Sequence, residues 1–150
     1  MYAYIYLPPR ALLKVSQIYA TVGNENKAQH LMDTYGIHRD HIFNSRDASF
    51  LQDLMRCTGN RGADVVLNSL GGNLLHTSWR CVAPYGKMLE LGKRDFLGHG
   101  MLSMDLFKSN RAFFGVDLNQ FLEECPDEFN EYIYHFPTTK PWTNMNQCYI

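Results

Sequence analysis

The stretch Ala63-Asp-Val-Val-Leu-Asn-Ser-Leu-Gly-Gly72 decides the fold. Its first five residues form a nearly continuous apolar run, which is typical of a strand buried on both faces of a parallel sheet. The polar residues and glycines from Asn68 onward predict a loop at the carboxyl end of that strand. A helix is then expected to run to about Cys81. The stretch therefore predicts one strand–loop–helix unit of an α/β protein.

The same alternation of strand and helix patterns continues on both sides of this unit. The pattern predicts strands over residues 18–22, 41–44, 87–91 and 113–116, with a turn at 84–86 before the third of these. It predicts helices over residues 25–35, from about 47 to 59, and over 123–134. Strands that alternate with helices in this way favour a doubly wound parallel sheet.

The segment in front of residue 18 lacks the glycine-rich turn that opens a dinucleotide-binding fold. Pro8-Pro9-Arg10-Ala11 stands in the corresponding place, and proline has no backbone N–H to offer a pyrophosphate. Residues 1–7 alternate tyrosine with aliphatic residues and could supply an extra strand, but their connection to Ile18 is near the minimum for a parallel crossover. We therefore expect an incomplete Rossmann-type sheet without the usual first strand and turn.

Composition excludes several classes of partner. The 150 residues carry a formal net charge of -1, so no global basic field attracts nucleic acid or anionic lipid. No apolar run is long enough to span a membrane, and no secretory signal is recognisable. The four cysteines form no CxxC pair, which argues against a zinc site and a disulfide framework. We expect a cytoplasmic protein without a bound metal.

The end of the first predicted parallel strand carries a candidate phosphate site. NAD-specific folds place an acidic residue there to bind the ribose hydroxyls. Here Gly23 and Asn24 follow the strand, and Lys27 lies one helical turn further on. Arg46, after the next strand, would lie near the same sheet edge, and two cations suit a 2′-phosphate. The alternative is that Lys27 and Arg46 are ordinary solvated surface cations.

Two further groups follow buried strands, namely Asn68-Ser69-Leu70 and Leu91-Gly92-Lys93. Ligands of open α/β sheets bind at the carboxyl ends of strands, so both groups are candidate cofactor contacts. The alternative is turn chemistry, because Asn, Ser and Gly commonly end strands. Lys93 could donate a proton or pair with a phosphate, or it could be a solvated loop residue.

The residues resemble the enoyl reductase domain of fungal highly reducing polyketide synthases, a member of the medium-chain dehydrogenase/reductase superfamily. The resemblance rests on six stretches in order: Ile18-Tyr-Ala-Thr-Val-Gly-Asn-Glu-Asn-Lys27, His41-Ile-Phe-Asn-Ser-Arg-Asp47, Asp64-Val-Val-Leu-Asn-Ser-Leu70, Trp79-Arg-Cys-Val-Ala-Pro84, Leu91-Gly-Lys-Arg-Asp-Phe96 and Phe113-Phe-Gly-Val-Asp-Leu118.

The resemblance implies NADPH-dependent reduction of an α,β-unsaturated thioester carried on an acyl carrier protein. By that analogy Lys27 and Arg46 hold the 2′-phosphate, and Asn68-Ser69-Leu70 and Phe114-Gly115-Val116 line the cofactor crevice. Lys93 matches a lysine proposed as a proton donor in the related fatty acid synthase. Family members usually carry Ser where this chain has Asn24, which can also donate to phosphate.

The resemblance also implies an organisation for the chain. Residues 1–17 and 135–150 diverge from the family, and residues 18–134 form a partial NADP-binding domain. The substrate-binding subdomain is expected to be missing, so we expect a truncated domain that binds NADPH without catalysing reduction alone. The alternative is a non-catalytic remnant or an interaction module. Exposed edges where the missing first strand belongs would favour a homodimer or poor solubility.

Overall fold

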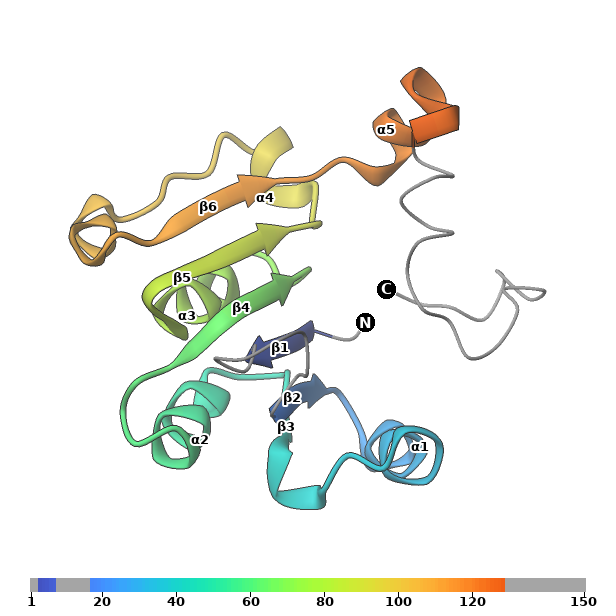
Figure 1. Cartoon of the computed structure of the whole chain (residues 1–150), viewed down its shortest axis with the longest axis vertical. Helices are drawn as coiled ribbons and strands as arrows, with labels where there is room; N and C mark the ends of the chain where they lie inside the picture. Colours follow the sequence, from blue (N-terminus) through green and yellow to red (C-terminus); the bar gives the residue numbers. More distant parts are fainter. Residues whose placement is uncertain (1–2, 8–16, 129–150) are drawn as a thin grey trace.

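The computed structural model describes residues 3–7 and 17–128, which form one six-stranded sheet with helices on both faces (Figure 1). The strands are β1 (Ala3–Leu7), β2 (Gln17–Val22), β3 (Ile42–Asn44), β4 (Ala63–Asn68), β5 (Val82–Glu90) and β6 (Ala112–Gly115). The α-helices are α1 (Glu25–Tyr35), α2 (Ser49–Cys57), α3 (Asn73–Arg80), α4 (Arg94–Leu97) and α5 (Leu118–Glu124). Two short 3₁₀ segments are η1 (Arg39–His41) and η2 (Met104–Ser109). The expectation of an α/β Rossmann-type fold is confirmed.

The strands are ordered β3-β2-β1-β4-β5-β6, which is the spatial order of dinucleotide-binding folds. Strand β1 occupies the first-strand position, but it pairs antiparallel with both β2 and β4 (Figure 1). The other neighbouring pairs are parallel. Residues 3–7 therefore fill the gap that the sequence predicts, in the direction opposite to that of a Rossmann first strand.

Side chains that alternate along β2 and β3 divide the core into two layers. Ala20 and Ile42 pack with Leu31 of α1 on one face of the sheet. Their chain neighbours Tyr19 and Phe43 join the larger core on the other face, below α2 and α3. Successive strand residues point to opposite faces, so both faces need a helical cover. Trp79 of α3 is the largest side chain that is fully buried there.

Two predicted boundaries are wrong. Residues 84–86 do not separate two elements, because β5 runs from Val82 to Glu90 without interruption. The register with β4 shifts between Ala63 and Val65, and Tyr85 has a φ of 64°, so these residues form a bulge inside the strand.

The last helix begins earlier than the pattern predicts. Helix α5 starts at Leu118 because the Asp117 carboxylate accepts hydrogen bonds from the amides of Asn119 and Gln120. It ends at Glu124, close to Pro126, which disfavours helical geometry in the residue before it. Residues 126–128 of the predicted helix are helical again, and its residues 129–134 lie outside the described residues.

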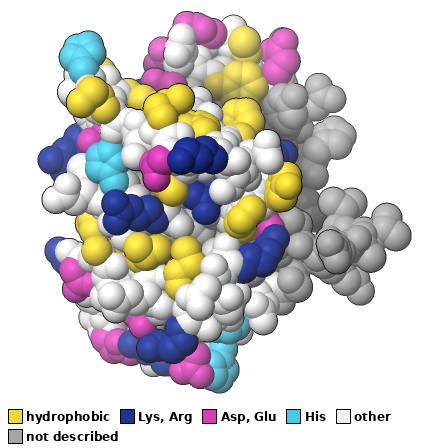
Figure 2. Space-filling view, turned by 90° about the vertical axis from the view of Figure 1, so that its left-hand side faces the viewer, with side chains coloured by type: hydrophobic (Ala, Val, Ile, Leu, Met, Phe, Trp, Pro, Cys, Tyr) yellow, Lys and Arg dark blue, Asp and Glu magenta, His cyan; other side chains and the backbone are white. Residues whose placement is uncertain are grey.

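Charged side chains of both signs are interspersed on the face shown in Figure 2, with apolar side chains between them. This mixture accords with the formal net charge of -1. Within the described residues, every helix is too short or too polar to cross a lipid bilayer.

Candidate cofactor-binding site

The residues that the sequence singles out all lie at or near the carboxyl edge of the parallel strands. Gly23 follows β2, Arg46 follows β3 and Ser69 follows β4, while Leu91 follows β5 and Val116 follows β6. Strands β2 and β4 are both antiparallel to β1, so all five of these strands end at one edge. Ligands of open α/β sheets bind at this edge.

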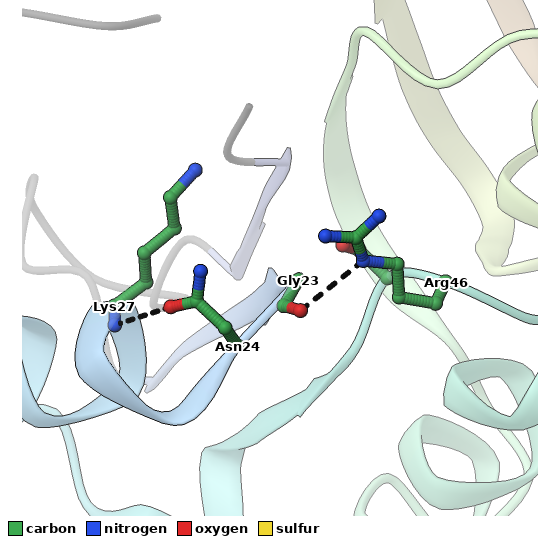
Figure 3. Close-up of a pocket in the computed structure, with 5 residues that line it drawn as sticks. Gly23, Asn24, Lys27 and Arg46 are labelled. Atoms are coloured by element: carbon green, nitrogen blue, oxygen red, sulfur yellow. Dashed lines mark hydrogen bonds between the residues drawn. The ribbon is translucent and has the colours of Figure 1, made fainter.

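A cavity of about 240 Å³ is lined by Lys27 and Arg46, which are predicted to hold a 2′-phosphate, and by Gly23 and Asn24, which are predicted cofactor contacts. Its lining consists of Gly23, Asn24, Lys27 and Arg46, together with Ser45, which the sequence analysis did not single out. Figure 3 shows the side chains of Lys27 and Arg46 reaching from α1 and from the loop after β3 to either side of Gly23 and Asn24. Among the described residues, the lining contains two cations and no carboxylate, so it favours an anion.

Two hydrogen bonds hold Arg46 in this position. Its Nε donates to the Gly23 carbonyl oxygen over 3.1 Å, and its amide donates to Asn44 Oδ1 over 3.0 Å. Gly23 permits this contact, because a Cβ atom at residue 23 would lie 3.0 Å from Arg46 Nε. The hydrogen bond uses only Nε, which leaves the two terminal nitrogens available as donors to a ligand.

Asn24 positions Lys27 at the start of α1. Asn24 is the N-cap residue, and its Oδ1 accepts from the Lys27 amide over 3.0 Å (Figure 3). This bond fixes the first turn of the helix and leaves Asn24 Nδ2, which is a donor, for a ligand. The N-terminus of the helix also carries partial positive charge.

A second cavity, of about 350 Å³, lies beyond the carboxyl ends of β5 and β6. Of the predicted residues it contains Lys93, Gly115 and Val116. Lys93 Nζ lies 2.8 Å from Asp117 Oδ1, and this hydrogen bond is the main reason why the pKa of Asp117 is lowered. Asp117 was missed in the sequence, although an Asp before a helical segment is a capping signal.

Buried polar contacts occupy the region between the two cavities. Asn68 donates to Glu90 and to the Leu70 carbonyl oxygen, and the Gly92 amide donates to Glu90. The side chain of Leu70 belongs to the core. Asn68 and Leu70 thus have structural contacts already, whereas Ser69 and Leu91 are half-buried at the strand ends. Phe114 is 49% exposed at the end of β6.

Glu90 is the main residue of this region that the sequence analysis missed. A signal was present, because Glu90 follows Met88 at the spacing that places both on the same face of the strand. Both residues are buried.

Comparisons with known proteins show the family to which the chain belongs. The zinc-binding dehydrogenase family model matches residues 11–136. The highly reducing polyketide synthase gloL of Glarea lozoyensis is 67% identical over 106 residues, which are 71% of this chain and 4% of that protein. The highly reducing polyketide synthase FUM1 of Gibberella moniliformis is 64% identical over 105 residues, 70% of this chain and 4% of that protein. The chain thus spans a small part of these relatives.

Solved structures show the same relationship. The nucleotide-binding subdomain of the enoylreductase domain of PpsC from Mycobacterium tuberculosis is 29% identical with a TM-score of 0.67, over 77% of this chain and 63% of that one. CurK enoyl reductase is 27% identical with a TM-score of 0.60, over 77% of this chain and 34% of that one. The chain therefore belongs to the zinc-binding dehydrogenase family and, within it, is similar to the nucleotide-binding subdomain of polyketide synthase enoyl reductases.

Proposed function

We propose that this chain is the NADPH-binding part of an enoyl reductase domain and that the cavity at Lys27 and Arg46 takes the 2′-phosphate. The observation that carries the proposal is that these two cations, from separate elements, line one cavity to which the described residues contribute no carboxylate. A phosphate dianion can accept from the Arg46 terminal nitrogens, from Lys27 and from Asn24 Nδ2. A free ribose hydroxyl offers no charge to these groups, so NADH is expected to bind more weakly.

The reaction of the complete domain would be reduction of an α,β-unsaturated acyl thioester presented by an acyl carrier protein. When bound, NADPH supplies a hydride to the β-carbon and becomes NADP⁺, while the α-carbon takes a proton. We assign that proton to the Lys93 ammonium, which lies in the second cavity beside Asp117. Phe114, Gly115 and Val116 would line the cofactor crevice on the same side.

In this proposal residues 18–134 form the nucleotide-binding unit, and residues 3–7 add the antiparallel strand at its centre. The described residues form a single sheet domain, so the wall that encloses the thioester would have to come from a separate substrate-binding subdomain. We therefore propose that the chain binds NADPH but does not reduce a thioester alone.

The family name refers to zinc, and the described residues do not fit a zinc site. Structural and catalytic zinc sites need three or more His, Cys or carboxylate ligands, and no such group occurs among residues 3–7 and 17–128. No step of the proposed reaction passes through a metal.

Isothermal titration calorimetry of the purified chain with NADPH, and with NADH as the matched control, tests the proposal. We expect NADPH to bind at least about tenfold more tightly, because a charged hydrogen bond contributes roughly 1.5–3 kcal/mol. Equal affinities, or no binding by a chain whose circular dichroism shows a folded α/β protein, would overturn it.

A second candidate function is self-association at the β6 edge of the sheet. Strand β6 is an edge strand of the described sheet. Phe114 in this strand, and Phe96 and Leu97, which line a cavity with Gly115, are 47% to 79% exposed. Exposed apolar surface beside an open strand favours pairing with a second copy. Sedimentation velocity over a range of concentrations tests this, and a monomer at all concentrations would exclude a homodimer.

A further inference from the structure

The direction of β1 bears on how much of a dinucleotide this sheet can hold. In a dinucleotide-binding fold the first strand ends at the carboxyl edge and turns there into a helix, whose N-terminus binds the pyrophosphate. Here Ala3 pairs with Thr21 near that edge, and Leu7 pairs with Gln17 at the opposite one. Strand β1 therefore ends at the edge of the sheet opposite to the one where a pyrophosphate would bind.

One amide at each of two nearby helix N-termini has a protein acceptor. In α1 the Lys27 amide is bound by Asn24 Oδ1. At the start of α3 the Gly72 amide donates to both carboxylate oxygens of Asp95, over 2.9 and 3.1 Å. An internal carboxylate thus lies where an anion would otherwise meet the α3 N-terminus, and it repels a second anion.

The 2′-phosphate cavity does not depend on these features. The five described lining residues come from the end of β2, the first turn of α1 and the loop after β3. These segments are held by their own hydrogen bonds, from the Lys27 amide to Asn24 Oδ1 and from Arg46 Nε to the Gly23 carbonyl oxygen. The cavity is complete without a pyrophosphate turn.

We propose that this chain recognises the 2′-phosphorylated adenosine end of its ligand alone, and that the diphosphate and nicotinamide add little affinity. The inference rests on the proposed function, since it concerns the same cavity. It changes the class of ligand from a whole dinucleotide to any adenosine that carries a 2′-phosphate.

Four ligands in calorimetric titrations of the full chain test the inference. Adenosine 2′,5′-bisphosphate and 5′-AMP differ only in the 2′-phosphate, and NADPH and NADH form the matched dinucleotide pair. We expect the bisphosphate to bind within about threefold of NADPH, and the 2′-phosphate to improve Kd by the same factor, about tenfold or more, in both pairs.

The outcomes separate this inference from the proposed function. If NADPH binds about tenfold or more tightly than the bisphosphate, the dinucleotide half contributes, so the inference is overturned and the proposed function stands. If neither pair shows a preference for the 2′-phosphate, the assignment of the cavity is wrong and both fail. Because the ligand is varied and the protein is not, folding is identical in all four titrations.

Discussion

Asn68 Nδ2 donates to Glu90 Oε2 over 2.5 Å, and this contact joins the carboxyl ends of β4 and β5 inside the protein. Glu90 is only 2% exposed, and its other oxygen accepts from the Gly92 amide over 2.6 Å. Burial raises the pKa of Glu90 to about 7, with a smaller contribution from the neighbouring Asp95 carboxylate. The hydrogen bonds from Asn68 and from the Gly92 amide lower the pKa of Glu90, but they do not cancel the effect of burial.

This raised pKa predicts that stability falls as the pH rises. The folded chain holds the Glu90 proton more tightly than the unfolded chain, in which the pKa is near the ordinary value of 4.5. The contribution is complete below pH 4.5 and is lost as the pH passes through about 7. Glu90→Gln removes the ionisation, so we expect its unfolding free energy to decline less between pH 5 and pH 8 than that of wild type, by up to about 3 kcal/mol.

Urea unfolding at several pH values measures this difference, with Glu123→Gln on the exposed face of α5 as the matched control. The control is expected to follow wild type at every pH. A Glu90→Gln curve parallel to wild type would show that Glu90 has an ordinary pKa in the folded chain.

The sequence predicts the sheet best where one residue type dominates. The apolar run of β4 and the β-branched and aromatic residues of β2 identify strands, and parallel pairing then brings the residues after them to one edge. The same reasoning could not give the direction of β1, because alternating tyrosine and aliphatic residues suit either pairing. The short connection to β2 allows a hairpin more easily than a parallel crossover.

The candidate site, too, could be predicted from the sequence only in part. Lys27 and Arg46 could be placed near each other from strand order alone, but the hydrogen bond from Arg46 to Gly23 depends on the actual path of the loop. Neither the pairing of Asp95 with the Gly72 amide nor that of Lys93 with Asp117 follows from strand order, since each crosses between separate loops. Long-range side-chain contacts of this kind cannot be predicted from the sequence alone.

Removing either cation of the cavity is expected to weaken binding of the 2′-phosphate and to leave binding of the rest of the ligand unchanged. We expect Lys27→Ala and Arg46→Ala each to weaken NADPH binding by about tenfold or more, because each loses a charged contact of roughly 1.5 kcal/mol or more. NADH affinity should change little. Calorimetry of both ligands measures the effect.

Matched variants of exposed cations outside the cavity provide the control. Lys108→Ala and Arg56→Ala remove the same charges elsewhere, on η2 and α2, and should leave the preference for NADPH intact. If they reduce NADPH binding as much as the cavity variants do, the effect comes from net charge and not from the cavity.

Substitution of Asn24, the N-cap residue of α1, is expected to change both stability and NADPH binding. Asn24→Ala removes the acceptor of the Lys27 amide and should lower the unfolding free energy by about 1 kcal/mol. It also removes a donor from the phosphate cavity. Asn24→Ser keeps a capping oxygen and a hydroxyl donor, so thermal unfolding and NADPH titration should both return close to wild type. Equal destabilisation by Ala and Ser would mean that the cap is not the stabilising contact.

Substitutions can distinguish the roles of Lys93, the proposed proton donor, and Asp117, the N-cap residue of α5. Removing the ammonium in Lys93→Ala should raise the pKa of Asp117 toward its ordinary value, because the hydrogen bond from Lys93 is the largest cause of the lowered pKa. Carboxyl carbon chemical shifts followed against pH measure this change. The fold should scarcely respond, since exposed ion pairs contribute little to stability.

Asp117→Ala removes the acceptor of the Asn119 and Gln120 amides as well, so it should weaken α5 and increase amide exchange there. If Lys93→Ala leaves the Asp117 titration unchanged, the two side chains are not paired in solution, and the assignment of Lys93 as a held proton donor loses its structural basis.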